Sequence, residues 1–385
     1  MSTERRLFLV AIVAGIAARI LQTATSLGSL DAALWFRFAE LIERVGILHS
    51  YAETTLMNHP PLALAIAKVT NRIGIACGLE FQDSFRLLQI AADVVTALVL
   101  VRIARRQVRA TGAMFAALLF FLSPAVVFIS AFHCNSDPLM MMFVTIAIAA
   151  ALEGKPLVAG AALACATGIK IVPLLAGPLF LFAFENRRQR MRFLAACIVG
   201  AAVIFLPAIV VSGPRFLQQV FGYTGFVRAW GLPLLAHVLQ ATTGVVVPLT
   251  WLPLVMVGAL GALWLAEWRR GMRIGAFHGA RLPALVASTY LMVLFLAPGF
   301  GVQYLYWPLP FIAFALPRWA AVAFHAVVSA YLFAAYTAWS DGWPWWFANG
   351  TGSPRVVELL SKSGVVLWVL IGVAAIAALR RLQRE

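Results

Sequence analysis

Long runs of apolar residues, separated by short polar segments, extend along the whole chain. Many of them approach the roughly 20 residues that a helix needs to cross about 30 Å of hydrocarbon. The runs do not alternate apolar and polar side chains, which argues against the strands of a membrane barrel. The pattern therefore predicts an all-α polytopic membrane protein with about twelve transmembrane helices. The predicted helices lie at residues 7–28, 85–103, 110–131, 139–152, 157–170, 172–184, 193–212, 245–267, 282–298, 303–317, 319–338 and 364–380.

Two segments near the start of the chain have a different pattern. In residues 32–50, apolar side chains recur at a spacing of three to four while charged side chains fill the other face. Residues 59–78 are apolar enough to cross, but a crossing would place the arginine cluster at 102–109 on the outer side. We predict that both segments are amphipathic helices lying in the outer interface, within a long first outer loop at 29–84. Residues 157–184 also fit one long, broken helix.

The composition agrees with a membrane protein. Of the 385 residues, 62% are hydrophobic and 12% are charged, whereas a soluble domain is about a quarter charged. The net charge of +15 is compatible with a nucleic-acid binder, but the basic residues form short clusters between apolar runs. Such clusters mark cytoplasmic loops. We therefore expect no nucleic-acid partner, cytoplasmic termini, and outer loops that also include 213–244 and 339–363.

The cysteines and the N-terminus each allow a second interpretation. The four cysteines form no CxxC pair, so we expect neither a disulfide nor a zinc site. The apolar run after Arg6 could be a signal peptide, but it is long for one and no A-x-A site follows. We interpret it as the first transmembrane helix.

Asp31 and His59 are candidate site residues in the first outer loop. Asp31 follows the first predicted helix, where a carboxylate could act as a general base or as the N-cap of an amphipathic helix. The two roles are compatible. His59 opens the sequence His-Pro-Pro-Leu, in which the diproline forms a rigid entry to a helix or holds the imidazole at a binding site.

A second set of candidates follows between the predicted spans. The turn from Phe132 to Pro138 contains His133, Asn135 and Asp137, and it is either a binding cluster or a capped helical hairpin. One histidine and one aspartate are a weak signal for a metal. Lys170 lies in an apolar stretch three residues before a proline. A lysine at membrane depth suggests an anchor for an anionic group such as phosphate, although it could also snorkel to the interface.

Aromatic residues are frequent in the later outer loops. Gln303 and Tyr304 lie in a glycine-bracketed loop that offers amide and phenol donors. The tryptophans at 343, 345 and 346 are interpreted as an interfacial belt, although aromatics in an outer loop could also stack on sugars or isoprenoid units.

The order of these features resembles the GT-C glycosyltransferases, which use sugars linked to lipid phosphates. The stretch from Asp31-Ala-Ala-Leu-Trp35 to His59-Pro-Pro-Leu62 is similar to the first lumenal loop of the glucosyltransferases of asparagine-linked glycosylation. His-Pro-Pro-Leu also resembles the protein O-mannosyltransferases, which have Asp-Glu where this chain has Asp31-Ala32. The 132–137 turn is similar to a His-Phe-Gln-Tyr-Asn segment of the glucosyltransferases, and Gly168–Pro173 resembles the Lys-x-x-Pro element of bacterial mannosyltransferase-like members. The late His-Glu pair of the glucosyltransferases has no match, and Gln303-Tyr304 stands in that place.

The resemblance implies an inverting transfer of a hexose, mannose or glucose, from a polyprenyl-phosphate donor to a hydroxyl group of a glycolipid, glycan or protein. Asp31 would be the base, and cations would balance the charge of the leaving phosphate. The remaining implied substrate-binding residues are His59, His133, Asn135, Asp137, Lys170, Gln303, Tyr304, Arg215 and Arg228. No metal or other cofactor is implied.

The resemblance also implies a layout. Residues 1–212 would form the conserved transmembrane module, and residues 213–385 a variable one. The active site would face the periplasm of a bacterial inner membrane, consistent with the alanine- and arginine-rich composition. The membrane lipids would surround both modules.

Two other functions are possible for a membrane protein of this kind, and each predicts something that a glycosyltransferase does not. A transporter or flippase of a lipid-linked sugar predicts internal repeats and polar residues on both sides, and neither is visible. A non-catalytic membrane scaffold would tolerate the loss of Asp31.

Overall fold

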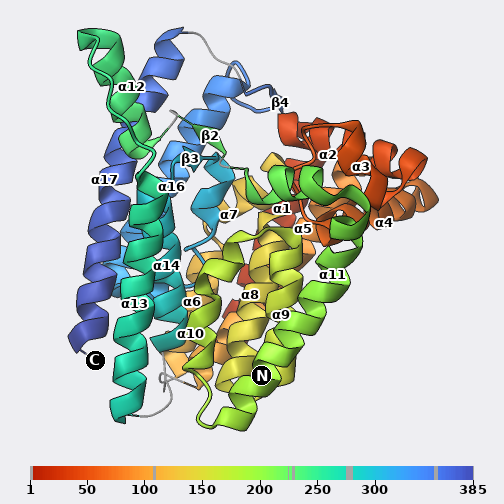
Figure 1. Cartoon of the computed structure of the whole chain (residues 1–385). Helices are drawn as coiled ribbons and strands as arrows, with labels where there is room; N and C mark the ends of the chain where they lie inside the picture. Colours follow the sequence, from red (N-terminus) through yellow and green to blue (C-terminus); the bar gives the residue numbers. More distant parts are fainter. Residues whose placement is uncertain are drawn as a thin grey trace.

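The structure is a computed structural model that describes residues 3–106, 110–223, 225–227, 230–274, 281–350 and 354–384 (Figure 1). Long helices run side by side through the molecule, and several of the shorter ones gather at one end. In chain order, the elements are α1 (Thr3–Ala24), β1 (Gly28–Ser29), α2 (Leu30–Val45), α3 (Ile47–Glu53), α4 (Pro61–Cys77), α5 (Phe81–Arg105), α6 (Ala110–Phe121), α7 (Pro124–Val127), the π-helix η1 (Phe128–His133), α8 (Asp137–Leu152), α9 (Pro156–Ile169), the 3₁₀-helix η2 (Val172–Ala176), α10 (Gly177–Leu181), α11 (Arg187–Phe221), β2 (Phe226–Val227), α12 (Gly231–Thr243), α13 (Leu252–Ile274), α14 (Arg281–Leu296), β3 (Gly299–Phe300), the 3₁₀-helix η3 (Val302–Tyr306), α15 (Ile312–Ala315), α16 (Arg318–Trp339), β4 (Phe347–Ala348) and α17 (Pro354–Arg384).

The chain is an all-helical, multi-span membrane protein. Within the described residues, five helices are long and apolar enough to cross a bilayer, namely α5, α11, α13, α16 and α17. A sixth span arises if the apolar segments Met114–Phe121 and Pro124–His133, which are bent by 52°, are counted together. Several further apolar helices, including α1, α8, α9 and α14, are shorter. The figure of about twelve spans stays a prediction, because it requires these shorter helices to cross as well.

Prolines account for the places where a predicted helix is broken. Residues 303–317 do not form one helix, because Pro308 and Pro310 interrupt the backbone ladder between η3 and α15. The 157–184 stretch is a broken element, in which α9 ends just before Lys170 and a 3₁₀ turn containing Pro173 follows. The short helix α12 was not expected from the sequence.

The two predicted amphipathic segments form the helices α2 to α4. Helix α2 buries Trp35, Phe38 and Ile42 on one face. Helix α4 begins at Pro61, after Pro60 has held the chain extended, as expected for a proline in the first turn. These three helices lie at the same end as α12 and β4, which we call the loop end (Figure 1).

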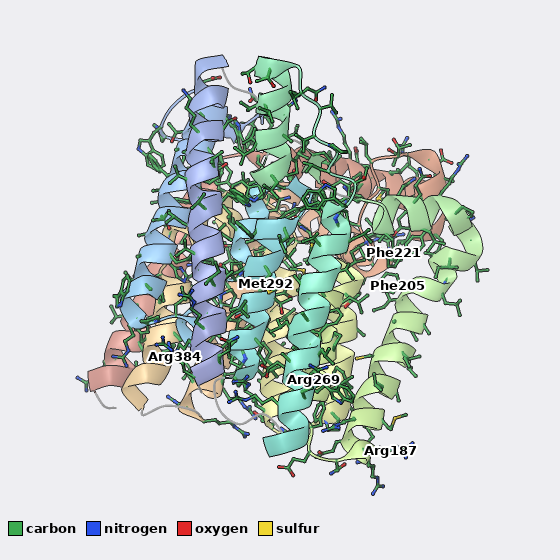
Figure 2. All side chains as sticks on the ribbon, turned by 60° about the vertical axis from the view of Figure 1, so that its left-hand side comes forward. Arg187, Phe205, Phe221, Arg269, Met292 and Arg384 are labelled. Carbon is green, nitrogen blue, oxygen red and sulfur yellow. The ribbon has the colours of Figure 1, made fainter. Side chains whose placement is uncertain are left out.

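Basic residues mark the opposite end, which we call the basic end. Arg187, Arg269 and Arg384 lie there, while Phe221, at the other terminus of α11, lies toward the loop end (Figure 2). Arg102 and Lys155 form ion pairs with Glu153 at the junction of α8 and α9. The basic clusters and the elaborate loops are therefore separated along the length of the bundle.

Two short sheets connect loops that are distant in sequence. Strand β1 pairs in parallel with β4, and the amide of Leu27 donates to the carbonyl of Trp346 at 2.7 Å. Strand β2 pairs antiparallel with β3. The first sheet joins the loop before α2 to the loop after α16, so early and late parts of the chain meet at the loop end.

A buried ion pair joins α1 to α5. Arg19 of α1 and Asp93 of α5 are both fully buried, with Nε and Oδ2 2.9 Å apart. Arg19 also donates to the carbonyl of Phe121, and the hydroxyl of Tyr306 donates to Asp93. A charge at membrane depth is costly unless it is paired, and this pair is satisfied by protein groups from four segments. We therefore assign Arg19 to the packing of the bundle.

Candidate active site

A cavity of about 450 Å³ lies near the loop end. Its polar wall includes six of the residues singled out in the sequence, namely Asp31, His59, Asn135, Lys170, Gln303 and Tyr304. Another wall is apolar and contains Phe221 and Phe226 with side chains of α13 and α14, including Met256, Val293 and Leu294. The cavity thus has a charged and hydrogen-bonding side next to a hydrocarbon-like side.

Asp31 lies in the first turn of α2 and is not the N-cap of this helix. The N-cap is Ser29, whose hydroxyl accepts a hydrogen bond from the amide of Asp31 at 3.2 Å. The Asp31 carboxylate is therefore free to point elsewhere, and its side chain is 30% exposed at the cavity wall. Its Oδ2 accepts a hydrogen bond from Asn135 Nδ2 at 2.5 Å and lies 3.1 Å from Nε2 of His133.

The charges of Asp31 and His59 follow from their surroundings. Burial raises the pKa of Asp31, but the neighbouring His133 and the hydrogen bonds from His133 and Asn135 outweigh it and lower the pKa to about 2. Burial lowers the pKa of His59 to about 3. At neutral pH the cavity therefore presents an ionised carboxylate and a neutral imidazole. The imidazole packs against Trp35, with ring centroids 4.3 Å apart.

The turn before α8 brings His133 and Asn135 to Asp31. The π-helix η1 ends at His133, and Cys134 adopts the left-handed conformation with φ 63°. Asn135 Oδ1 then accepts from the amide of Ser136 at 2.6 Å, while its Nδ2 faces Asp31. The segment is thus both a structured hairpin and a cluster of polar groups. Its two interpretations from the sequence are compatible.

Asp137 and Lys170 form a buried ion pair beside the cavity. Asp137 is fully buried, and its Oδ2 accepts from Lys170 Nζ at 2.6 Å. Its Oδ1 accepts from the indole nitrogen of Trp307, also at 2.6 Å. Both carboxylate oxygens are therefore engaged by protein groups, and Asp137 holds Lys170 and Trp307 in the cavity wall. Lys170 does not snorkel, since it is paired and only 12% exposed.

Aromatic rings extend this wall. Tyr304 stacks on Trp307 with ring centroids 4.4 Å apart, and the ammonium of Lys170 lies 5.6 Å from the centre of the Tyr304 ring. Trp307 and Tyr223, which also lines the cavity, were not selected from the sequence. The only sequence signal for Trp307 was its place in the glycine-bracketed loop.

The remaining candidates lie elsewhere. Arg215 lies away from the cavity lining and donates to the carbonyl of Ala52 at 3.0 Å, which ties α11 to the end of α3. Arg228 lies outside the described residues. The described part of the chain contains no group of three His, Cys, Asp or Glu side chains that could hold a metal ion.

The predicted tryptophan belt is only partly seen. Trp345 is buried and packs against Phe128 and Phe132 of η1. Trp343 and Trp346 are 60% and 59% exposed. Trp345 therefore supports the segment that carries His133, while its two neighbours remain available to a membrane surface.

Replacing His133 by glutamine is expected to raise the pKa of Asp31, because the variant loses the electrostatic interaction and the hydrogen bond with His133 that lower this pKa. A base with a lowered pKa is active above that pKa and loses activity as the pH falls through it. The acidic limb of the plot of kcat/KM against pH should therefore move to higher pH in His133→Gln. The matched control is His49→Gln, which changes an exposed histidine of α3. Superimposable acidic limbs for wild type and His133→Gln would contradict this assignment.

A multi-span helical bundle whose loop-end cavity joins an ionised carboxylate, a lysine and an apolar wall has the architecture of the GT-C class of membrane glycosyltransferases. The comparisons with known proteins agree with this class. Residues 58–298, more than half of the chain, match glycosyltransferase family 87, and the chain belongs to this family. It is therefore a membrane glycosyltransferase, and the GT-C resemblance predicted from the sequence is confirmed.

The fold resembles that of a solved membrane protein. It is the crystal structure of ArnT from Cupriavidus metallidurans bound to undecaprenyl phosphate. The two chains are 14% identical, the match covers 98% of this chain and 77% of ArnT, and the TM-score is 0.54. No curated protein matches the sequence.

Proposed function

We propose that the protein transfers a hexose, mannose or glucose, from a polyprenyl-phosphate donor to a hydroxyl acceptor, with inversion at the anomeric carbon. The observation that carries the proposal is the cavity in which the Asp31 carboxylate and the Lys170 ammonium share a space with an apolar wall. A donor of this class has a sugar, one phosphate and a long hydrocarbon chain. These three parts need polar groups, a cation and an apolar surface, and the cavity provides all of them.

In the proposed reaction, Asp31 removes the proton from the acceptor hydroxyl, whose oxygen attacks the anomeric carbon of the donor. The bond between that carbon and the phosphate oxygen breaks as the new glycosidic bond forms. Polyprenyl phosphate leaves with the electron pair. Inversion follows because the attacking oxygen and the leaving phosphate lie on opposite faces of the sugar.

The other residues of the cavity suit supporting roles. The Lys170 ammonium, held by Asp137, stabilises the phosphate charge that grows on the leaving group. Asn135 and His133 hold Asp31 as a carboxylate. The neutral imidazole of His59 and the amide of Gln303 hydrogen-bond to sugar hydroxyls, and Tyr304 offers a ring face for stacking.

Two further observations support the lipid-linked donor. The apolar wall suits the first isoprene units of the chain. The ArnT structure, which shares the fold, holds undecaprenyl phosphate. We place the loop end at the periplasmic face of a bacterial inner membrane and the basic end in the cytoplasm, with about twelve crossings. The acceptor is a glycolipid, glycan or protein hydroxyl, and no metal takes part.

The experiment that tests this function uses purified protein in lipid nanodiscs with polyprenyl-phosphate-mannose or polyprenyl-phosphate-glucose and a membrane lipid extract as acceptor. We expect one donor to be consumed, with one polyprenyl phosphate released for each sugar transferred. Donors that stay intact would contradict the proposal. If intact donor instead crosses the bilayer of proteoliposomes, the protein is a flippase.

A further inference from the structure

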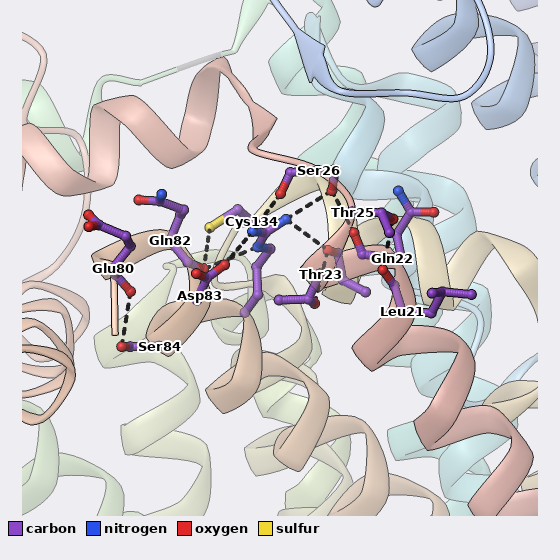
Figure 3. Close-up of polar contacts among 12 residues, drawn as sticks. Leu21, Gln22, Thr23, Thr25, Ser26, Glu80, Gln82, Asp83, Ser84 and Cys134 are labelled. Carbon is purple, nitrogen blue, oxygen red and sulfur yellow. Dashed lines mark hydrogen bonds and ion pairs between the residues drawn. The ribbon is translucent and has the colours of Figure 1, made fainter. Parts of the chain in front are cut away.

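Arg86 is a fully buried cation near the start of α5 that the proposed chemistry does not use. Its guanidinium donates to five acceptors drawn from three parts of the chain. Three of the residues that supply them, Ser26, Gln82 and Asp83, are labelled in Figure 3. Nη2 donates to the carbonyl of Ser26 at 2.9 Å and to Oδ1 of Asp83 at 2.7 Å. Nη1 donates to the hydroxyl of Ser26 at 3.1 Å and to the carbonyl of Ala131 at 3.4 Å.

These contacts join the two segments that deliver the active-site groups. Ser26 belongs to the segment that leads through β1 to Asp31. Ala131 belongs to η1, which leads to His133 and Asn135. Arg86 therefore clamps the segments together a few residues before each of them reaches the cavity.

Further along, the same two segments are connected by two more links. The hydroxyl of Ser29 donates to the carbonyl of His133 at 2.5 Å, and Asn135 donates to Asp31. The segments are also closely packed, because a Cβ atom on Gly28 would lie 2.8 Å from the carbonyl oxygen of Phe132. The two segments are thus connected at successive points, first by Arg86 and then by Ser29 and Asn135. The position of Asp31 relative to His133 and Asn135 therefore depends on the contacts of Arg86.

We propose that Arg86 is a positioning residue for the transfer reaction, acting through the alignment of Asp31 with His133 and Asn135. The inference rests on the proposed function of Asp31 as the base. Arg86 itself does not line the cavity and touches no substrate. A guanidinium suits the role because its planar fork directs several N–H groups to fixed acceptors, whereas a lysine ammonium is a point charge on a flexible stem. A displacement of about 1 Å in a catalytic group can cost roughly 100-fold in rate.

The test is a double-mutant cycle between Arg86→Lys and Asp31→Asn, measured as polyprenyl phosphate release with saturating donor. We expect Arg86→Lys to lower kcat by about 100-fold when Asp31 is present. In the Asp31→Asn background, where no base remains to be aligned, the same change should leave the residual rate unaltered. A loss of folded protein alone would lower the rate by the same factor in both backgrounds, so non-additivity separates positioning from stability.

Arg281→Lys is the matched control. Arg281 is also a buried arginine that pairs with a carboxylate, Glu267, and donates to a backbone carbonyl, that of Leu382. It lies in the first turn of α14, far along this helix from the cavity-lining Val293. We expect Arg281→Lys to lower the thermal midpoint while kcat per folded molecule stays at the wild-type value.

The outcomes separate this inference from the proposed function. Absence of transfer by the wild type with both donors overturns the proposed function before any variant is compared. With an active wild type, an Arg86→Lys enzyme at full kcat, or one whose loss is the same in both backgrounds, overturns the role of Arg86. If Arg86→Lys does not fold, Ser26→Ala takes its place in the cycle, since it removes one acceptor of Nη1. We then expect a several-fold loss that again disappears in the Asp31→Asn background.

Discussion

Asp31→Asn is expected to lower kcat for sugar transfer by roughly three orders of magnitude, because the variant cannot take the proton from the acceptor hydroxyl. The change keeps the size and shape of the side chain. The structure places the carboxylate next to Asn135 and His133, with a pKa of about 2, so the wild-type residue is ready to act as a base at neutral pH. The KM for the donor should change little, since Asp31 is not among the groups proposed to hold the lipid and the phosphate. Initial rates of polyprenyl phosphate release at varied donor concentration measure both quantities.

Asp341→Asn is the matched control for this variant. Asp341 is exposed at the loop end and has φ 55°, a conformation that asparagine adopts readily. The Asp341→Asn variant makes the same chemical change in a loop away from the cavity lining. We expect wild-type kcat for the control. Equal rates for Asp31→Asn and wild type would remove Asp31 as the base and would mean that another group takes the proton.

Lys170→Met is expected to lower the stability by about 3–5 kcal/mol and to abolish transfer. The variant leaves the fully buried Asp137 without its cation, and only the indole N–H of Trp307 remains as a partner. An uncompensated buried carboxylate is the main cost. The double variant Lys170→Met/Asp137→Asn removes both charges and should recover most of the stability without recovering transfer. Thermal unfolding in detergent gives the first comparison, and donor consumption gives the second.

The exposed pair of Arg72 and Glu43 is the matched control for the buried pair. It joins α4 to α2 with Nε and Oε1 2.7 Å apart, and the Arg72 side chain is 64% exposed. Exposed pairs contribute little to stability, so Arg72→Met should leave the thermal midpoint nearly unchanged. A double variant at 137 and 170 that regains full transfer would show that the Lys170 ammonium is not needed for the leaving group.

Most of the helix positions could be predicted from the sequence, because an apolar run between basic clusters has few alternatives in a bilayer. The structure does not contain all twelve predicted helices as unbroken helices, because several of the apolar runs are interrupted. Pro308 and Pro310 lie within the predicted 303–317 helix, and prolines inside a helix break it.

The site was predicted less completely. Asp31, His59, Asn135 and Lys170 were recognisable because polar side chains at the ends of apolar runs are unusual. The residues that hydrogen-bond to these side chains or hold them in position could not be recognised from the sequence. Trp307 meets Asp137 only through tertiary packing, and Arg86 is the second residue of the predicted 85–103 span, between Phe85 and Leu87. Pairings across the bundle depend on which helices become neighbours, and local spacing does not encode this.

The pairing of β1 with β4 has a consequence for biosynthesis. Strand β1, which leads to Asp31, leaves the ribosome long before its partner strand at Phe347–Ala348. While the residues between these strands are being made, the nascent chain carries Asp31, the proposed base, without the strand that pairs beside it. The sheet beside the candidate site is completed only after α16 has been made, so a chain that stops before Phe347 lacks this support for Asp31.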